Sequence, residues 1–81
     1  MNIATVTIGK ITGTARDIVD GCVRITLSVG LSEIRAKAEL TGHAIESARK
    51  LFVASFPNES QIDLATVLGL LRDECDEYYC E

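Results

Sequence analysis

The alternation of apolar and polar residues over residues 22–29 (CVRITLSV) constrains the fold more than any other feature of this chain. Successive side chains of a strand point to opposite faces, so this pattern predicts a strand with one buried face. The inward-facing residues are expected to be Val23, Ile25, Leu27 and Val29. Residues 3–8 (IATVTI) are rich in β-branched side chains and predict a second strand. One of its faces would carry Ala4, Val6 and Ile8, and the other Ile3, Thr5 and Thr7.

Residues 9–21 connect these two predicted strands and contain the turn dipeptide Asp20-Gly21. The stretch also carries a weak strand signal of its own. We therefore interpret residues 9–21 as a long arm of the first hairpin.

Residues 32–53 allow two interpretations. As one helix, their apolar residues recur at steps of three and four, with Ser32 as the N-cap. As a strand followed by a helix, residues 34–40 alternate and Gly42 breaks the chain. A four-residue turn at residues 30–33 would place every inward residue of the preceding strand opposite an inward residue, which favours the second interpretation. The same register would place Arg24 opposite Glu39, a stabilising pair of opposite charges.

Two helices are predicted in the second half of the chain, at about residues 43–55 and 61–79. Pro57 ends the first, and Ser60 followed by Asp63 resembles a capping box at the start of the second. The core stripe of the second helix is expected to contain Leu64, Leu68, Leu71, Cys75 and Tyr78. The predicted fold class is α+β: a small antiparallel sheet of three strands, or four if residues 9–21 supply one, covered on one face by both helices.

The length of 81 residues fits a single domain. A content of 47% hydrophobic and 25% charged residues is typical of a globular chain rather than a disordered one. The N-terminal residues lack the basic and apolar regions of a signal peptide, and no stretch has the ~20 apolar residues of a membrane span. Three cysteines, an odd number, do not define a disulfide framework. We therefore expect a cytoplasmic protein without membrane contact.

The negative charge of the chain is concentrated at its C-terminal end. Residues 73–81 contain five acidic residues and no basic one, and the net charge of the whole chain is −4. Carboxylates at a helix C-terminus oppose the helix dipole, so helix stability does not explain them. One explanation is a protein partner with a basic surface, and the alternative is that these acids only keep the terminus soluble. The expected partner-binding residues are Asp73, Glu74, Asp76, Glu77, Tyr78, Tyr79 and Glu81, with the tyrosines as anchors.

The second predicted helix also has apolar residues outside its core stripe. These residues are Ile62, Val67 and Leu70. A helix that is apolar nearly all round is buried on several sides or shared with a second chain. The alternative hypothesis for this protein is therefore a homodimer or larger homo-oligomer that assembles through these three side chains.

No catalytic or metal-binding pattern is present in the sequence. His43 is the sole histidine, and a general-base role would require a nucleophile such as Cys22 beside it. Cys75 and Cys80 are five residues apart, which matches neither a CxxC redox pair nor a zinc half-site. The glycines around Lys10 lack the Walker spacing. We therefore expect no enzymatic activity, no cofactor and no metal.

Direct nucleic-acid binding is not expected either. The eight basic residues are scattered along an acidic chain, and no aromatic residue interleaves with a basic run. Arg24, Arg35 and Lys37 would share the outer face of the predicted sheet, where Glu33 and Glu39 would offset their charge.

These features predict a non-enzymatic protein-binding module, an inhibitor or adaptor that acts by occluding its partner through the acidic C-terminal helix. In size and general character the chain resembles the small accessory proteins of phages and mobile elements, including anti-CRISPR proteins. That resemblance includes no motif and transfers no site residue. It implies inhibition by occlusion of another protein.

Overall fold

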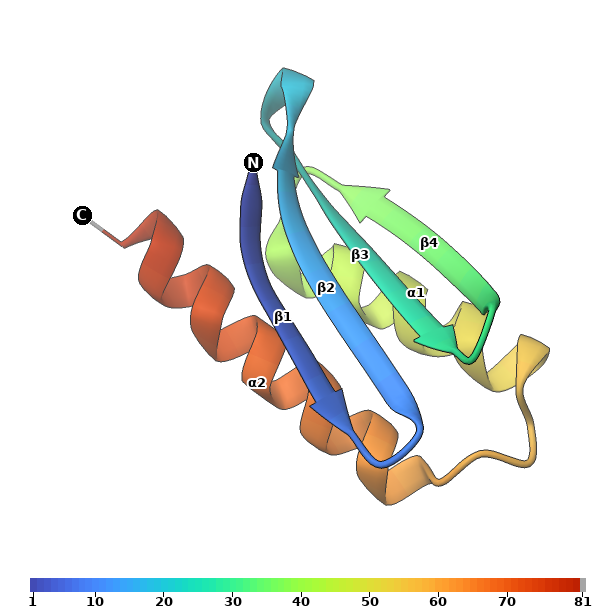
Figure 1. Ribbon diagram of the computed structural model, residues 1–81. Coiled ribbons are helices and arrows are strands. Elements are labelled where there is room, and N and C mark those ends of the chain that lie inside the picture. Colours follow the sequence, from blue (N-terminus) through green and yellow to red (C-terminus); the bar gives the residue numbers. More distant parts are fainter. Residues whose placement is uncertain (81) are drawn as a thin grey trace.

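Four strands occupy the first half of the chain and two helices the second (Figure 1). The computed structural model describes residues 1–80, without the side chain of Asp20. The strands are β1 (Asn2–Ile8), β2 (Ile11–Ile18), β3 (Cys22–Val29) and β4 (Ser32–Ala38). The helices are α1 (Thr41–Ser55) and α2 (Gln61–Tyr79), and a 3₁₀ helix, η1 (Val19–Gly21), joins β2 to β3.

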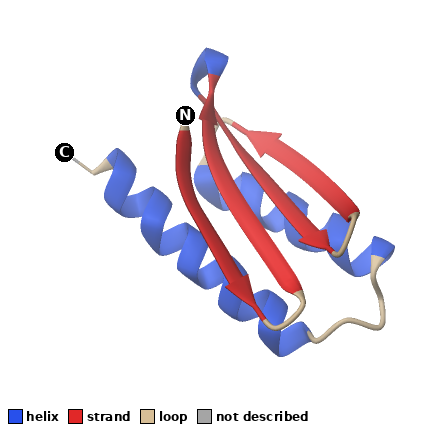
Figure 2. Ribbon diagram, viewed as in Figure 1, coloured by secondary structure: helices blue, strands red, loops and turns tan. Residues whose placement is uncertain are grey.

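The strands form one antiparallel sheet in the order β1-β2-β3-β4, so each strand pairs with its neighbour in the sequence. Both helices lie on the same face of this sheet, with α2 against β1 and β2 and α1 against β3 and β4 (Figures 1 and 2). No described element covers the opposite face (Figure 2). The predicted α+β class is therefore confirmed, and the stretch between residues 9 and 21 supplies the fourth strand.

The core lies between the inner face of the sheet and the two helices. Val23, Ile25 and Leu27 of β3 are buried there, as the alternation of residues 22–29 predicts. The helices contribute the buried side chains Ala44, Ile45, Ala48, Phe52, Leu64, Val67, Leu68, Leu71 and Cys75. Complete burial of a Leu, Ile or Phe side chain stabilises the fold by about 1.5–3 kcal/mol, so this layer holds the sheet and helices together.

Strand β2 and helix α2 approach each other closely at Gly13. A Cβ atom on Gly13 would lie 2.5 Å from Val67 Cγ1 and 2.7 Å from Leu71 Cδ1. Non-bonded carbon atoms do not approach so closely, because their favourable separation is about 3.5–4.0 Å. The missing side chain at this position therefore allows α2 to pack directly on the middle of the sheet.

The register between β3 and β4 differs from the predicted one by two residues. Gly30 adopts a left-handed φ of 62°, which permits a two-residue turn in place of the predicted four-residue turn. A shift of two residues keeps the alternation, so inward side chains still meet inward side chains. On the outer face, however, Arg24 lies opposite Lys37. The predicted pairing of Arg24 with Glu39 is therefore wrong.

Strand β1 contains an irregularity that the sequence did not predict. Asn2 lies opposite Arg16 and Ala4 lies opposite Ala15, so Ile3 is an extra residue in β1. Ile3 is partly buried and packs against the core. Its predicted place on the polar face of the strand is therefore wrong, because the bulge reverses the side on which this side chain lies.

The helical half matches the predicted boundaries closely. Helix α1 begins at Thr41, two residues before the predicted start, and α2 covers the predicted range of residues 61–79. Ser60 Oγ accepts a hydrogen bond from the Asp63 backbone N–H at 3.2 Å, which confirms the predicted N-cap. Residues 32–53 form a strand followed by a helix, the interpretation that the register argument favoured.

Candidate functional site

The acidic C-terminal residues lie on an ordered helix. Helix α2 continues to Tyr79, and its last two turns expose four carboxylates. These exposed acids are Asp73, Glu74, Asp76 and Glu77. Tyr78 and Tyr79 are also exposed, whereas Glu81 lies outside the described residues. The ion pairs of the described chain join Arg35 to Glu33 and Arg49 to Glu46, so none of them involves these four acids.

Tyr78 fixes the end of α2 to the sheet. Its hydroxyl donates a hydrogen bond to Asp17 Oδ2 at 3.0 Å and contacts Met1 Sδ at 3.3 Å. The Met1 ammonium in turn donates to the Asp17 carbonyl oxygen at 2.8 Å. The hydrogen bond to Asp17 raises the pKa of Tyr78, with burial as a smaller cause. The Tyr79 ring lies edge-on to that of Tyr78, with 4.9 Å between centroids.

A hollow of about 270 Å³ opens beside this end of the helix. It is lined by Ile3, Glu74, Glu77 and Tyr78, and we call it the acidic hollow. The bulge in β1 provides its apolar wall through Ile3, and α2 provides the two carboxylates and the aromatic ring. An apolar wall, an aromatic ring and two carboxylates suit the stem and charged head of a Lys or Arg side chain.

The cysteine and histidine side chains considered as reactive groups are Cys75, Cys22 and His43. Cys75 is buried in the core, and burial, followed by the charges of Asp76 and Glu74, raises the pKa of its thiol. A thiol with a raised pKa is a poor nucleophile at neutral pH. His43 is exposed on the first turn of α1 and Cys22 is the first residue of β3. Within residues 1–80, no cluster of three or more metal-ligating side chains forms.

The structure separates the three residues predicted for self-association. Val67 is fully buried, because it packs into the space left by Gly13. Ile62 and Leu70 are exposed by 79% and 42%. The predicted three-residue surface is therefore wrong for Val67, whose side chain fills the core of its own chain.

The uncovered face of the sheet carries polar and basic side chains in rows. Arg16 of β2, Arg24 of β3 and Lys37 of β4 are register partners across three adjacent strands. We call these three residues the basic row. Thr14 and Thr26 form the next row with Arg35, and Thr12 and Ser28 form the third with Glu33. Like charges directly opposite each other destabilise a sheet, so the basic row has a cost in folding stability.

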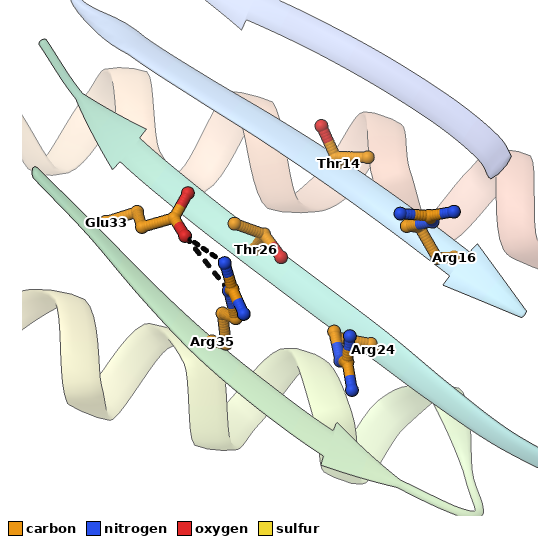
Figure 3. A pocket seen from close by; sticks show the side chains of 6 residues that line it. All are labelled: Thr14, Arg16, Arg24, Thr26, Glu33 and Arg35. Atoms are coloured by element: carbon orange, nitrogen blue, oxygen red, sulfur yellow. Dashed lines mark hydrogen bonds and ion pairs between the residues drawn. The ribbon is translucent and has the colours of Figure 1, made fainter. Parts of the chain in front are cut away.

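Figure 3 shows a shallow hollow on this face, with a volume of about 280 Å³. Its lining residues are Thr14, Arg16, Arg24, Thr26, Glu33 and Arg35, and their side chains project away from the helices. Glu33 accepts hydrogen bonds from Arg35 at 3.0 Å from Nε and 2.5 Å from Nη2. The carboxylate of Glu33 is thus engaged by Arg35, two rows away from the basic row.

Reasoning from sequence placed Arg24 and Lys37 on the outer face but missed Arg16 and the pairing of the three residues in one row. The predicted register placed Glu39 beside Arg24, whereas β4 ends at Ala38 and Glu39 lies beyond it. Arg16 belongs to β2, a strand for which the sequence gave only a weak signal. Once β2 is recognised as a strand, the alternation of Thr12, Thr14 and Arg16 places Arg16 on the outer face.

Comparisons with known proteins give no relative: no family model, no curated protein and no solved structure matches this chain. No helix among residues 1–80 combines the length and the apolar character needed to cross a membrane. The acidic hollow and the basic row are the two surfaces that bear on the function of this chain.

Proposed function

We propose that this protein is a non-enzymatic binding module that occludes a basic surface of another protein through the end of α2. The acidic hollow is the observation that supports this proposal. The helix end thus offers a concave site as well as negative charge, since Ile3 and Tyr78 form apolar walls next to Glu74 and Glu77.

The proposed contact is a Lys or Arg side chain of the partner placed in the acidic hollow. Its aliphatic stem packs against Ile3 and the Tyr78 ring, and its cationic head pairs with Glu74 and Glu77. The hydrogen bond between Tyr78 and Asp17 holds the helix end in position before binding, which reduces the entropy cost of association. Asp73 and Asp76 add long-range attraction that is sensitive to salt.

A titration with a short acetylated Gly-Arg repeat peptide tests this proposal directly. Chemical-shift changes in a nitrogen–proton correlation spectrum should concentrate at Ile3, Glu74, Glu77 and Tyr78. The substitution pair Glu74→Gln and Glu77→Gln should weaken binding about tenfold or more, because it removes both carboxylates of the acidic hollow.

The pair Asp73→Asn and Asp76→Asn is the matched control. It removes the same charge from the same helix but leaves the lining of the acidic hollow intact. We expect it to weaken binding only about two- to threefold, as for exposed charges at a rim. Equal losses for both pairs would mean that net charge alone attracts the peptide, and the acidic hollow would then have no role.

A further inference from the structure

The basic row is an arrangement that folding alone does not explain. Arg16, Arg24 and Lys37 lie directly opposite one another, and side chains in such positions have Cβ atoms about 4.5–5.5 Å apart. None of the three belongs to an ion pair among the described residues. The row therefore concentrates positive charge on an open face. An anionic ligand bound to these side chains would offset the repulsion between them.

We propose that the outer face of the sheet binds the phosphodiester backbone of a nucleic-acid duplex, with the basic row on the phosphates. Neighbouring strands are about 4.8 Å apart, so the row extends over about 10 Å. Successive phosphates of a duplex strand wind around its axis, and the long, flexible side chains of the row can each reach one of them. Three cations thus allow about three phosphate contacts.

The residues beside the basic row have the chemistry of backbone contacts. Thr14 and Thr26 line the hollow next to it, and hydroxyl groups donate hydrogen bonds to phosphate oxygens. Arg16 and Arg24 have planar guanidinium groups that engage a phosphate through two parallel hydrogen bonds. These contacts carry no sequence information, so the binding is expected to be independent of sequence.

The composition of this face favours a duplex over other polyanions. Single-strand binders use aromatic side chains on which bases stack, and the residues that line this hollow include no aromatic one. Protein interfaces draw most of their binding energy from Trp, Tyr and Arg anchors, and of these three types the lining residues provide only arginine. A duplex hides its bases and offers phosphates at its surface, which is the chemistry that arginines and threonines recognise.

This proposal is independent of the proposed function, because the two surfaces share no residue and lie on opposite sides of the sheet. Arg16 and Arg24 of the basic row project from the sheet face away from the helices (Figure 3), whereas the acidic hollow lies beside the end of α2. A duplex on the sheet would therefore leave the acidic hollow open to a protein partner.

Fluorescence anisotropy with a labelled mixed-sequence DNA duplex is the test. Three phosphate contacts predict a slope of about −2.7 in a plot of log K against log salt concentration, or about forty-fold weaker binding at 200 mM than at 50 mM salt. Replacing Arg24 by Gln should bring the slope to about −1.8, because it removes one contact. Replacing the whole row, Arg16→Gln with Arg24→Gln and Lys37→Gln, should abolish binding.

Lys50→Gln provides the matched control, because Lys50 is an exposed base on α1 in the helix layer. This variant should bind the duplex as the wild type does. The pair Glu74→Gln and Glu77→Gln should also retain duplex binding. Peptide binding by this variant reports on the acidic hollow, and duplex binding reports on the basic row. Either proposal can therefore fail without the other.

Several results would overturn the inference. No anisotropy change up to about 100 µM protein at low salt would do so, since this is the weak end of non-specific binding. Tighter binding of a single strand than of the duplex would exclude the duplex as the ligand. Self-association at low salt, measured by light scattering and abolished by the row variant, would assign the row to the acidic helix of a second copy.

Discussion

The two faces of the sheet differ in what selects their residues, although the same strands form both. The inner face carries Val23, Ile25 and Leu27 of β3, each buried against the helices. The outer face carries Arg24 and Thr26 between them, open to solvent on the side without helices. Burial determines which residues occupy the inner face, whereas the outer face needs only polar side chains to remain soluble.

This contrast shows why register affects the two faces unequally. A shift of two residues replaces one apolar inner pair by another, so the inner face hardly distinguishes the two registers. On the outer face the same shift exchanges Glu39 for Lys37 beside Arg24 and reverses the sign of the interaction. Which side chains become neighbours on the polar face therefore depends on the length of one turn, here the two residues after Val29.

The largest expected effect comes from a direct comparison of neighbouring residues on β3. Leu27→Ala removes a fully buried side chain and should lower the free energy of unfolding by about 2–5 kcal/mol. Thr26→Ala, on the outer face, should lower it by about 1 kcal/mol or less, because Ala has a lower strand preference than Thr. Urea unfolding of both variants measures the difference. Similar losses for the two would show that the outer face is covered in solution.

A smaller loss is expected from Gly13→Ala, which adds a methyl group to the inner face. Its Cβ would meet Val67 Cγ1 at 2.5 Å, so β2 and α2 have to separate. Overpacking of this kind costs about 1–3 kcal/mol. Gly69→Ala is the control, because a Cβ there meets no atom within 4 Å on an exposed part of α2. An unchanged unfolding midpoint for Gly13→Ala would contradict the close approach of α2 to the sheet.

Arg24→Glu should stabilise the protein while abolishing duplex binding. The substitution turns the like-charge pairs that residue 24 forms with Arg16 and Lys37 into two pairs of opposite charge. Each such pair is worth about 0.2–1 kcal/mol, so the thermal midpoint should rise and the gain should shrink in high salt. Calorimetry at two salt concentrations measures both effects. A destabilised variant would indicate that Lys37 is not the neighbour of Arg24, as in the register with Glu39.

The smallest effect is expected at Tyr78, at the margin of the inner layer. The hydrogen bond to Asp17 and, to a lesser extent, burial raise its pKa above the usual 10.0. The folded state thus favours the protonated phenol, and this contribution is fully present below pH 10 and is lost as the pH rises through the raised value. Tyr78→Phe should therefore lower the unfolding midpoint slightly at neutral pH, and the difference should disappear as the pH rises through the raised pKa of Tyr78. A difference that is independent of pH would exclude the phenol as its source.

The fold was largely predictable because burial leaves a periodic signal. The alternation of residues 22–29 predicted β3, and the apolar steps of three and four predicted α2 with its boundaries. Ile3 was misplaced because a β-bulge adds one residue without any sign in the hydrophobic pattern. Val67 was misplaced because its partner is the absent side chain of Gly13, a contact between elements far apart in sequence.

The candidate sites were less predictable, since they depend on how elements meet. The acids of α2 were visible in the sequence, but the acidic hollow also requires Ile3, which lies more than 70 residues away from Glu74. The basic row requires three strands in the correct register, and a single turn decides whether Lys37 or Glu39 lies beside Arg24. Neither arrangement leaves a local pattern in the sequence.

The meander of the sheet has a consequence for the order of events in folding. Strands β1 and β2, and likewise β3 and β4, are joined by two residues, so these hairpins close short loops at little entropic cost. The contact of Tyr78 with Asp17, in contrast, spans 61 residues of chain. We expect α2 to dock on β1 after the rate-limiting step, so Ile3→Ala should accelerate unfolding and leave the folding rate nearly unchanged in a chevron plot. The chain would then begin to unfold at the same helix end that is proposed to meet its partner.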